Sequence, residues 1–150
     1  MDEVLNQRYL LTDKLGQGGF GAVYQATDLL LDREVAVKVL NIKETDQDDM
    51  VSRFLTEAKI ASKLNHPNTL TIYDFGRNKE DCCYLVSELL LGESLHERLA
   101  RAVLPVASTL EILFQVSLAL KEAHYEKIVH RDIKPANIFL HGIKPDVAFT

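Results

Sequence analysis

Apolar residues recur at every second position through much of the first 87 residues, and this spacing predicts β-strands. Five strands are expected, at residues 9–15, 22–27, 33–40, 70–73 and 84–87. Between the third and fourth strands, at residues 46–64, the apolar spacing changes to three or four residues, which is typical of a helix. The N-terminal part is therefore expected to be an antiparallel five-stranded sheet with one helix.

Beyond residue 92 the spacing becomes mainly helical. One helix is expected at 94–101 and a longer one at 108–125, whose broad apolar face includes Leu113 and Leu120. The longer helix is expected to begin with the capping box Ser108-Thr109-Leu110-Glu111. Residues 88–92 then form a connector between a strand-rich part and a helical part, and the predicted fold class is α+β.

Composition and charge limit the functions to consider. The chain has 150 residues, 47% apolar and 26% charged, which is typical of one soluble globular domain. The net charge of −5 argues against general nucleic-acid binding but says little about a single nucleotide. No apolar run is long enough to predict a membrane segment, and a cytoplasmic location is expected. Cys82 and Cys83 are adjacent, so they predict free cysteines on opposite faces of a strand.

A glycine-rich turn and a lysine suggest a phosphate site. Gly16, Gly18 and Gly21 fit the pattern G-x-G-x-x-G, in which backbone N–H groups can approach phosphate oxygens. An ordinary hairpin turn and a dinucleotide-binding fingerprint are alternatives, but the fingerprint must open a helix, and strand-like residues follow Gly21. Lys38 shares a strand face with Ala36 and could meet a phosphate; the alternative is a solvated strand lysine.

The stretch HRDIKPAN at residues 130–137 carries the most specific chemistry. Asp132 could orient and deprotonate an attacking hydroxyl, and Lys134 could neutralise charge on a moving phosphate. Asn137, five residues after the aspartate, could hold a magnesium ion. This combination predicts phosphoryl transfer to a hydroxyl.

Over residues 9–140, these segments resemble the catalytic domain of bacterial-type serine/threonine protein kinases. The resemblance implies a protein-kinase-like fold. Its parts would be a leader at 1–8, an N-lobe at 9–87, a hinge at 88–92 and a partial helical C-lobe at 93–150. It also implies ATP and Mg²⁺ as cofactors, and Ser/Thr hydroxyls of a protein as the substrate.

The same resemblance implies roles for further residues. Val23 and Ala36 would lie above the adenine ring and Phe139 beneath it, with the hinge backbone near Glu88 and Leu90 also binding the nucleotide. Glu57, in the predicted helix at 46–64, would pair with Lys38.

Asp74-Phe75-Gly76 spells the metal-binding triplet of kinases, but it precedes the catalytic loop, whereas the functional triplet of the family follows it. Asp and Gly are common turn residues, so we expect this triplet to end a short strand and begin a turn. Asp74 is therefore not predicted to be a metal ligand.

The residues after Asn137 affect the expected activity. Residues 141–150 contain no metal-binding triplet, so this chain is expected to be a truncated kinase domain that transfers little phosphate by itself. The alternative is a kinase-like module that binds a nucleotide or a partner without transfer. A small-molecule phosphotransferase is disfavoured by the run at 133–137. The apolar face of the 108–125 helix would be left partly uncovered and could support association.

Overall fold

The computed structural model describes residues 3–18, 21–40, 47–78 and 82–142. The chain divides into two compact units: unit 1 comprises Met1–Asn65 and Leu70–Leu89, and unit 2 comprises His66–Thr69 and Leu90–Thr150. Each unit is described by itself. The division after Leu89 falls within the segment expected to be the connector. The predictions for Asp46 and for residues 143–150 concern positions outside the described residues.

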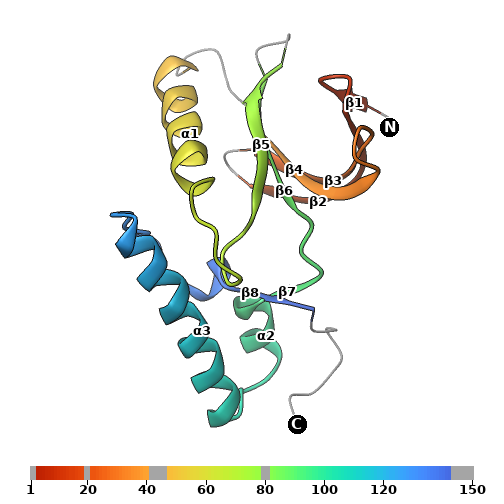
Figure 1. The fold of residues 1–150 in the computed structure, drawn as a ribbon. Helices are drawn as coiled ribbons and strands as arrows, with labels where there is room; N and C mark the ends of the chain where they lie inside the picture. Colours follow the sequence, from red (N-terminus) through yellow and green to blue (C-terminus); the bar gives the residue numbers. More distant parts are fainter. Residues whose placement is uncertain (1–2, 19–20, 41–46, 79–81, 143–150) are drawn as a thin grey trace. The chain divides into compact units, whose positions relative to one another are not determined.

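Unit 1 contains an antiparallel sheet and one helix, α1 (Gln47–Ala61) (Figure 1). The sheet order is β1-β2-β3-β4-β6-β5. Its strands are β1 (Glu3–Leu5), β2 (Tyr9–Gly18), β3 (Gly21–Asp28), β4 (Arg33–Leu40), β5 (Ile72–Arg77) and β6 (Cys83–Glu88). The expected number of five strands is corrected to six, because Glu3–Leu5 pairs with β2. Glu3–Leu5, within the segment expected to be a leader at 1–8, therefore forms an edge strand of the sheet.

A tight turn joins β1 to β2. Asn6 and Gln7 have φ angles of 52° and 58°, and the Arg8 amide donates to the Leu5 carbonyl at 3.1 Å. Two successive left-handed residues give a turn whose twist matches that of antiparallel strands. The Asn6 side chain also donates to the Tyr84 hydroxyl at 2.7 Å, which attaches the turn to β6.

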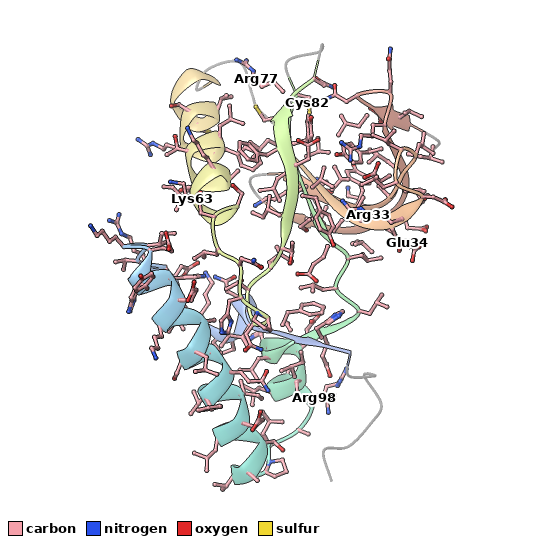
Figure 2. All side chains as sticks on the ribbon, viewed as in Figure 1. Arg33, Glu34, Lys63, Arg77, Cys82 and Arg98 are labelled. Carbon is pink, nitrogen blue, oxygen red and sulfur yellow. The ribbon has the colours of Figure 1, made fainter. Side chains whose placement is uncertain are left out.

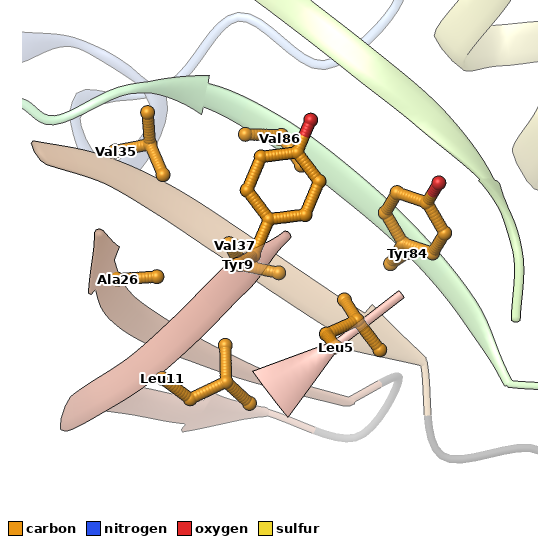
Figure 3. Close-up of a cluster of buried hydrophobic side chains, with 8 residues drawn as sticks. All are labelled: Leu5, Tyr9, Leu11, Ala26, Val35, Val37, Tyr84 and Val86. Carbon is orange, nitrogen blue, oxygen red and sulfur yellow. The ribbon is translucent and has the colours of Figure 1, made fainter. Parts of the chain in front are cut away.

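The core of unit 1 lies on one face of this sheet (Figure 3). Val35, Val37 and Val86 are fully buried there, while Tyr9 and Tyr84 pack with their ring centroids 6.2 Å apart. The remaining members of the cluster are Leu5, Leu11 and Ala26. Because side chains alternate along a strand, burial of Val35 and Val37 directs Ala36 and Lys38 to the opposite face.

An ion pair supports the same unit where β3 ends. The Arg8 guanidinium donates from Nε and from one terminal nitrogen to the two carboxylate oxygens of Asp28, both at 2.8 Å. Asp28 is completely buried, and its hydrogen bonds with Arg8 hold the pKa of its carboxyl below the usual value. Arg33, the first residue of β4, lies 3.6 Å from the same carboxylate (Figure 2). These contacts fix the turn between β3 and β4.

Helix α1 packs through a short apolar cluster. Val51 is buried with Leu40 and Cys83, and Phe54 and Leu55 pack against them. Cys83 is fully buried and Cys82 is partly exposed, which agrees with the prediction that their side chains point to opposite faces.

Unit 2 contains a two-stranded sheet of β7 (Gly92–Ser94) and β8 (Phe139–His141). Its helices are α2 (Leu95–Arg101), α3 (Val106–Tyr125) and the short 3₁₀ helix η1 (Pro135–Asn137). Buried Glu93 accepts from Arg98 and Arg101, each at 2.6 Å, which joins β7 to α2 (Figure 2). No helix in the described part of the chain has the length and apolar character needed to cross a membrane.

The predicted capping box at Ser108 is wrong. Helix α3 begins at Val106 after Pro105, and the Thr109 amide already donates to the Pro105 carbonyl at 3.0 Å, so Ser108 lies within the first turn. The capping box of unit 2 is at α2, where Ser94 and Glu97 exchange hydrogen bonds with each other's backbone amides. The S-x-x-E pattern at Ser94 was present in the sequence and could have identified it.

The apolar face of α3 is largely uncovered within the described residues. Val106, Leu110, Leu113 and Phe114 are between 54% and 77% exposed, and only Ala123 of this helix is buried. Of the predicted apolar face of this helix, Leu113 is exposed and Leu120 is half-buried, so that face is partly uncovered among the described residues.

Gly21 allows β3 to start close against β4. Its φ angle is +146°, and a Cβ atom added there would lie 2.1 Å from the Val39 carbonyl oxygen. Such a separation is far inside van der Waals contact, and the obstacle is backbone, which cannot move aside as a side chain can. A Cβ atom at Gly16, by contrast, would meet nothing within 4 Å.

We therefore predict that Gly21→Ala lowers the free energy of unfolding by about 2 kcal/mol or more, through the clash and the left-handed backbone. The matched control, Gly16→Ala, should change it by less than about 0.5 kcal/mol. Urea unfolding followed by circular dichroism measures both variants. Equal stability of the two would contradict the close approach of β3 to β4.

Candidate functional site

The residues predicted to bind the nucleotide in unit 1 form a row across the sheet. Gly16 of β2 pairs with Val23 of β3, Val23 pairs with Lys38 of β4, and Lys38 pairs with Leu85 of β6. Directly paired residues of antiparallel strands project to the same face. Val23 and Lys38 therefore share a face, and Ala36 shares it because it lies two residues from Lys38.

The exposure of β4 follows the predicted alternation. Val35 and Val37 are fully buried, Ala36 is partly exposed and Lys38 is exposed. A lysine ammonium on this face is accessible to an anionic ligand.

The glycine-rich segment is the hairpin between β2 and β3. Gly18 ends β2 and pairs with Gly21, which begins β3. Because Gly21 opens a strand, the dinucleotide-binding alternative, which requires a helix at this point, is excluded. Residues 19 and 20 at the tip lie outside the described part.

The expected pairing of Glu57 with Lys38 is not present. Both side chains are exposed, and no contact within 4.0 Å joins their charged groups among the described residues. Helix α1 faces the sheet through Val51 and Ala58, both buried. Each residue turns an α-helix by about 100°, so Glu57 projects well away from the neighbouring Ala58. The prediction from sequence spacing therefore placed Glu57 too close to the buried face of α1, which carries Val51 and Ala58.

Glu88 ends β6 and has a structural role. Its carboxylate accepts from the Thr71 amide at 2.7 Å, and its own amide donates to the Thr71 carbonyl at 3.0 Å. The side chain and the amide thus hold the start of β5, and the backbone carbonyl accepts from the Ser87 hydroxyl at 3.1 Å, which leaves its second lone pair to contact a nucleotide. In unit 2, Leu90 lies just before β7 and Phe139 begins β8.

The three predicted catalytic residues are in contact with one another in unit 2. The Lys134 ammonium lies 2.8 Å from Asp132 Oδ2, and Asn137 Nδ2 donates to that oxygen and to the Asp132 carbonyl, both at 2.9 Å. The hydrogen bond from Lys134, followed by that from Asn137, holds the pKa of the Asp132 carboxyl below its usual value. The side chains of Asp132 and Lys134 are 60% and 52% exposed, so both can be reached by a substrate.

The donor set near Asn137 fits magnesium. Asn137 uses its amide nitrogen for Asp132, and its Oδ1 atom accepts no hydrogen bond among the described residues. Amide and carboxylate oxygens are the ligands that magnesium prefers. No cluster of three or more His, Cys, Asp or Glu residues within the described ranges is arranged to hold a metal by itself.

Asp74 is held by other residues of unit 1. It lies inside β5, which corrects the expectation that the triplet ends a strand and begins a turn. Its carboxylate accepts from the Tyr9 hydroxyl at 2.7 Å and lies 3.8 Å from the Arg8 guanidinium. Burial, followed by this hydrogen bond, raises the pKa of Tyr9. The sequence offered no signal for this long-range pairing between β2 and β5.

Comparisons with known proteins identify the family. The model described as "Protein kinase domain" matches residues 9–147. Serine/threonine-protein kinase PrkC of Bacillus subtilis is 41% identical over 137 residues, which are 91% of this chain and 21% of that protein. Serine/threonine-protein kinase pkn3 of Myxococcus xanthus is 38% identical, over 89% of this chain and 24% of that protein.

A solved structure agrees with the sequence matches. The crystal structure of the Mycobacterium tuberculosis PknI kinase domain superposes with a TM-score of 0.80 at 29% identity, covering 93% of this chain and 58% of that one. The chain thus spans about a fifth of the length of PrkC and a little over half of the PknI kinase domain. The family match, the fold and the motif order agree: PrkC and pkn3, to which the chain is similar, are bacterial serine/threonine kinases, and the chain belongs to the protein kinase family.

Proposed function

We propose that this chain carries the nucleotide site and the catalytic loop of an ATP-dependent kinase that phosphorylates Ser/Thr hydroxyls on proteins. The observation that supports this most directly is the contact among Asp132, Lys134 and Asn137. A carboxylate, an ammonium and an amide held within hydrogen-bond distance are the groups that phosphoryl transfer to a hydroxyl requires.

The groups proposed to bind the nucleotide are described for each unit by itself. In unit 1, backbone amides of the hairpin that holds Gly16, Gly18 and Gly21 would contact phosphate oxygens, and exposed Lys38 would contribute positive charge. Val23 and Ala36, on the same face as Lys38, are small and apolar enough to cover an adenine ring. Within unit 2, the residues proposed for adenine contact are Leu90, through its backbone, and Phe139, through its apolar side chain.

The transfer step would use Asp132 as the acceptor of the substrate hydroxyl proton. Its carboxyl has a lowered pKa, so it stays ionised and can orient the hydroxyl toward the phosphate. Lys134 would neutralise the phosphoryl oxygens as the O–P bond to the nucleotide breaks and the bond to the substrate oxygen forms. A bound magnesium ion would neutralise the phosphates further, with Asn137 Oδ1 as a ligand.

A kinase-like module that binds nucleotide without transfer is the second candidate, because Asn137 is the one proposed metal ligand in the described chain. Transfer of labelled phosphate from ATP to a protein substrate, lost in Asp132→Asn, would support catalysis. Nucleotide binding without transfer would support the module.

The proposed partners are ATP and a protein substrate, and the proposed location is the cytoplasm. The uncovered face of α3 is a proposed surface for association.

Removal of Lys134 tests the electrostatics of the loop. We predict that Lys134→Ala raises the pKa of the Asp132 carboxyl toward its ordinary value, because the first cause of its lowering is lost. The carboxyl would then remain protonated to a higher pH than in the parent chain. NMR titration of the Asp132 side-chain carbon measures this shift, and Lys127→Ala is the control. An unchanged titration curve would show that Lys134 does not pair with Asp132.

Removal of Lys38 tests the nucleotide site. We predict that Lys38→Ala weakens ATP binding by about tenfold or more, because hydrogen bonds to charged groups each contribute about 1.5–3 kcal/mol. Isothermal titration calorimetry measures the affinity, and Lys121→Ala on exposed α3 controls for the loss of one positive charge. Equal affinity of Lys38→Ala and the parent chain would refute the proposed site.

A further inference from the structure

Two hydrogen bonds tie the segment before β7 to the end of β8. The Leu91 amide donates to His141 Nδ1 at 3.1 Å, and the Gly142 amide donates to the Leu91 carbonyl at 2.7 Å. Both bonds lie within unit 2, next to the pairing of Gly92 with His141. The spacing of His141 to the other histidines of the chain does not suggest a metal site.

The backbone explains why a side chain accepts this amide hydrogen. Gly92 has a φ angle of 143° and Gly142 one of 75°, so both strands turn out of regular geometry at this end of the sheet. Leu91 is exposed and its amide donates to no backbone carbonyl among the described residues, so a side chain or water can serve as its acceptor. The His141 imidazole supplies one, in the neutral form that carries its hydrogen on Nε2.

The contact between Leu91 and His141 lies next to two residues that are proposed to bind adenine. Leu90, whose backbone is a proposed nucleotide contact, directly precedes Leu91. Phe139, the proposed floor of the adenine site, lies two residues before His141 in the same strand. The imidazole thus joins the two segments of unit 2 that would contact the adenine ring.

We propose that His141 is a positioning residue for adenine: by holding the Leu91 amide, it fixes the Leu90 backbone relative to Phe139. This inference rests on the proposed nucleotide site. His141 need not contact the nucleotide itself. The role is separable from folding, because β7 and β8 pair along their whole length and the Leu95 amide also donates to the Ile138 carbonyl at 2.8 Å. Loss of the imidazole should therefore loosen one end of the strand pair without unfolding it.

The test compares two substitutions and two ligands. His141→Ala removes the acceptor, whereas His141→Asn keeps one, since the asparagine Oδ1 lies close to the position of Nδ1 in histidine. The ligands are ATP and inorganic tripolyphosphate, which has the phosphates but no adenine. His124→Ala, on exposed α3, is the matched control.

We expect His141→Ala to weaken ATP binding about fivefold, the value of one neutral hydrogen bond, while tripolyphosphate binding stays unchanged. His141→Asn should bind ATP within about twofold of the parent. The amide resonance of Leu91 should shift in the alanine variant and stay near its parent position in the asparagine variant.

Three results would overturn the inference. These are parent-like ATP affinity in His141→Ala, equal weakening of ATP and tripolyphosphate, and failure of His141→Asn to restore binding. The first result would show that His141 has no role in ATP binding. The second would indicate a general structural effect of the substitution. The third would show that His141 does not act as a hydrogen-bond acceptor. If the parent chain binds neither ligand, the proposed nucleotide site fails as well, which is a different outcome from parent binding that is insensitive to His141.

Discussion

The pairing of β4 with both of its neighbours is the constraint on which unit 1 depends. Arg33–Leu40 pairs residue by residue with β3 and over most of its length with β6. This register determines which side chains face the core. Val35 and Val37 are buried, and Ala36 and Lys38 must project to the other face. A slip of one residue would bury the lysine, so the energetics of the core and the placement of the proposed phosphate ligand are set by the same strand.

In unit 2, the proposed catalytic side chains are positioned by contacts between residues that are close in the sequence. The Asp132 carboxylate is surrounded by donors two and five residues away, so the loop arranges its own charges. Buried Glu93, by contrast, needs arginines from α2 to offset its desolvation, and it fixes the helix that follows the proposed hinge. The proposed catalytic side chains Asp132 and Lys134 are exposed, whereas Glu93 and Arg98 are buried. Exposure of the loop is compatible with the proposed protein substrate.

Local patterns predicted the strands, the glycine hairpin and the loop at Asp132, because period-two spacing and turn chemistry act over a few residues. The short strand β1 escaped detection, since three residues give little periodicity and its turn depends on the left-handed Asn6. Ser108 failed as a helix start because Pro105 had already set the backbone. The contacts Tyr9–Asp74 and Leu91–His141 join residues 65 and 50 positions apart, and no sequence period encodes them.

The face of the sheet that bears Lys38 is proposed to bind ATP. A ¹H–¹⁵N NMR titration of the isotope-labelled chain with ATP tests this proposal most directly. If ATP binds there, the largest amide shifts should fall on Gly16, Val23, Ala36 and Lys38, with smaller ones at Leu90 and Phe139. Shifts confined to other parts of the chain, such as α3, would contradict it, and so would an unchanged spectrum at millimolar ATP.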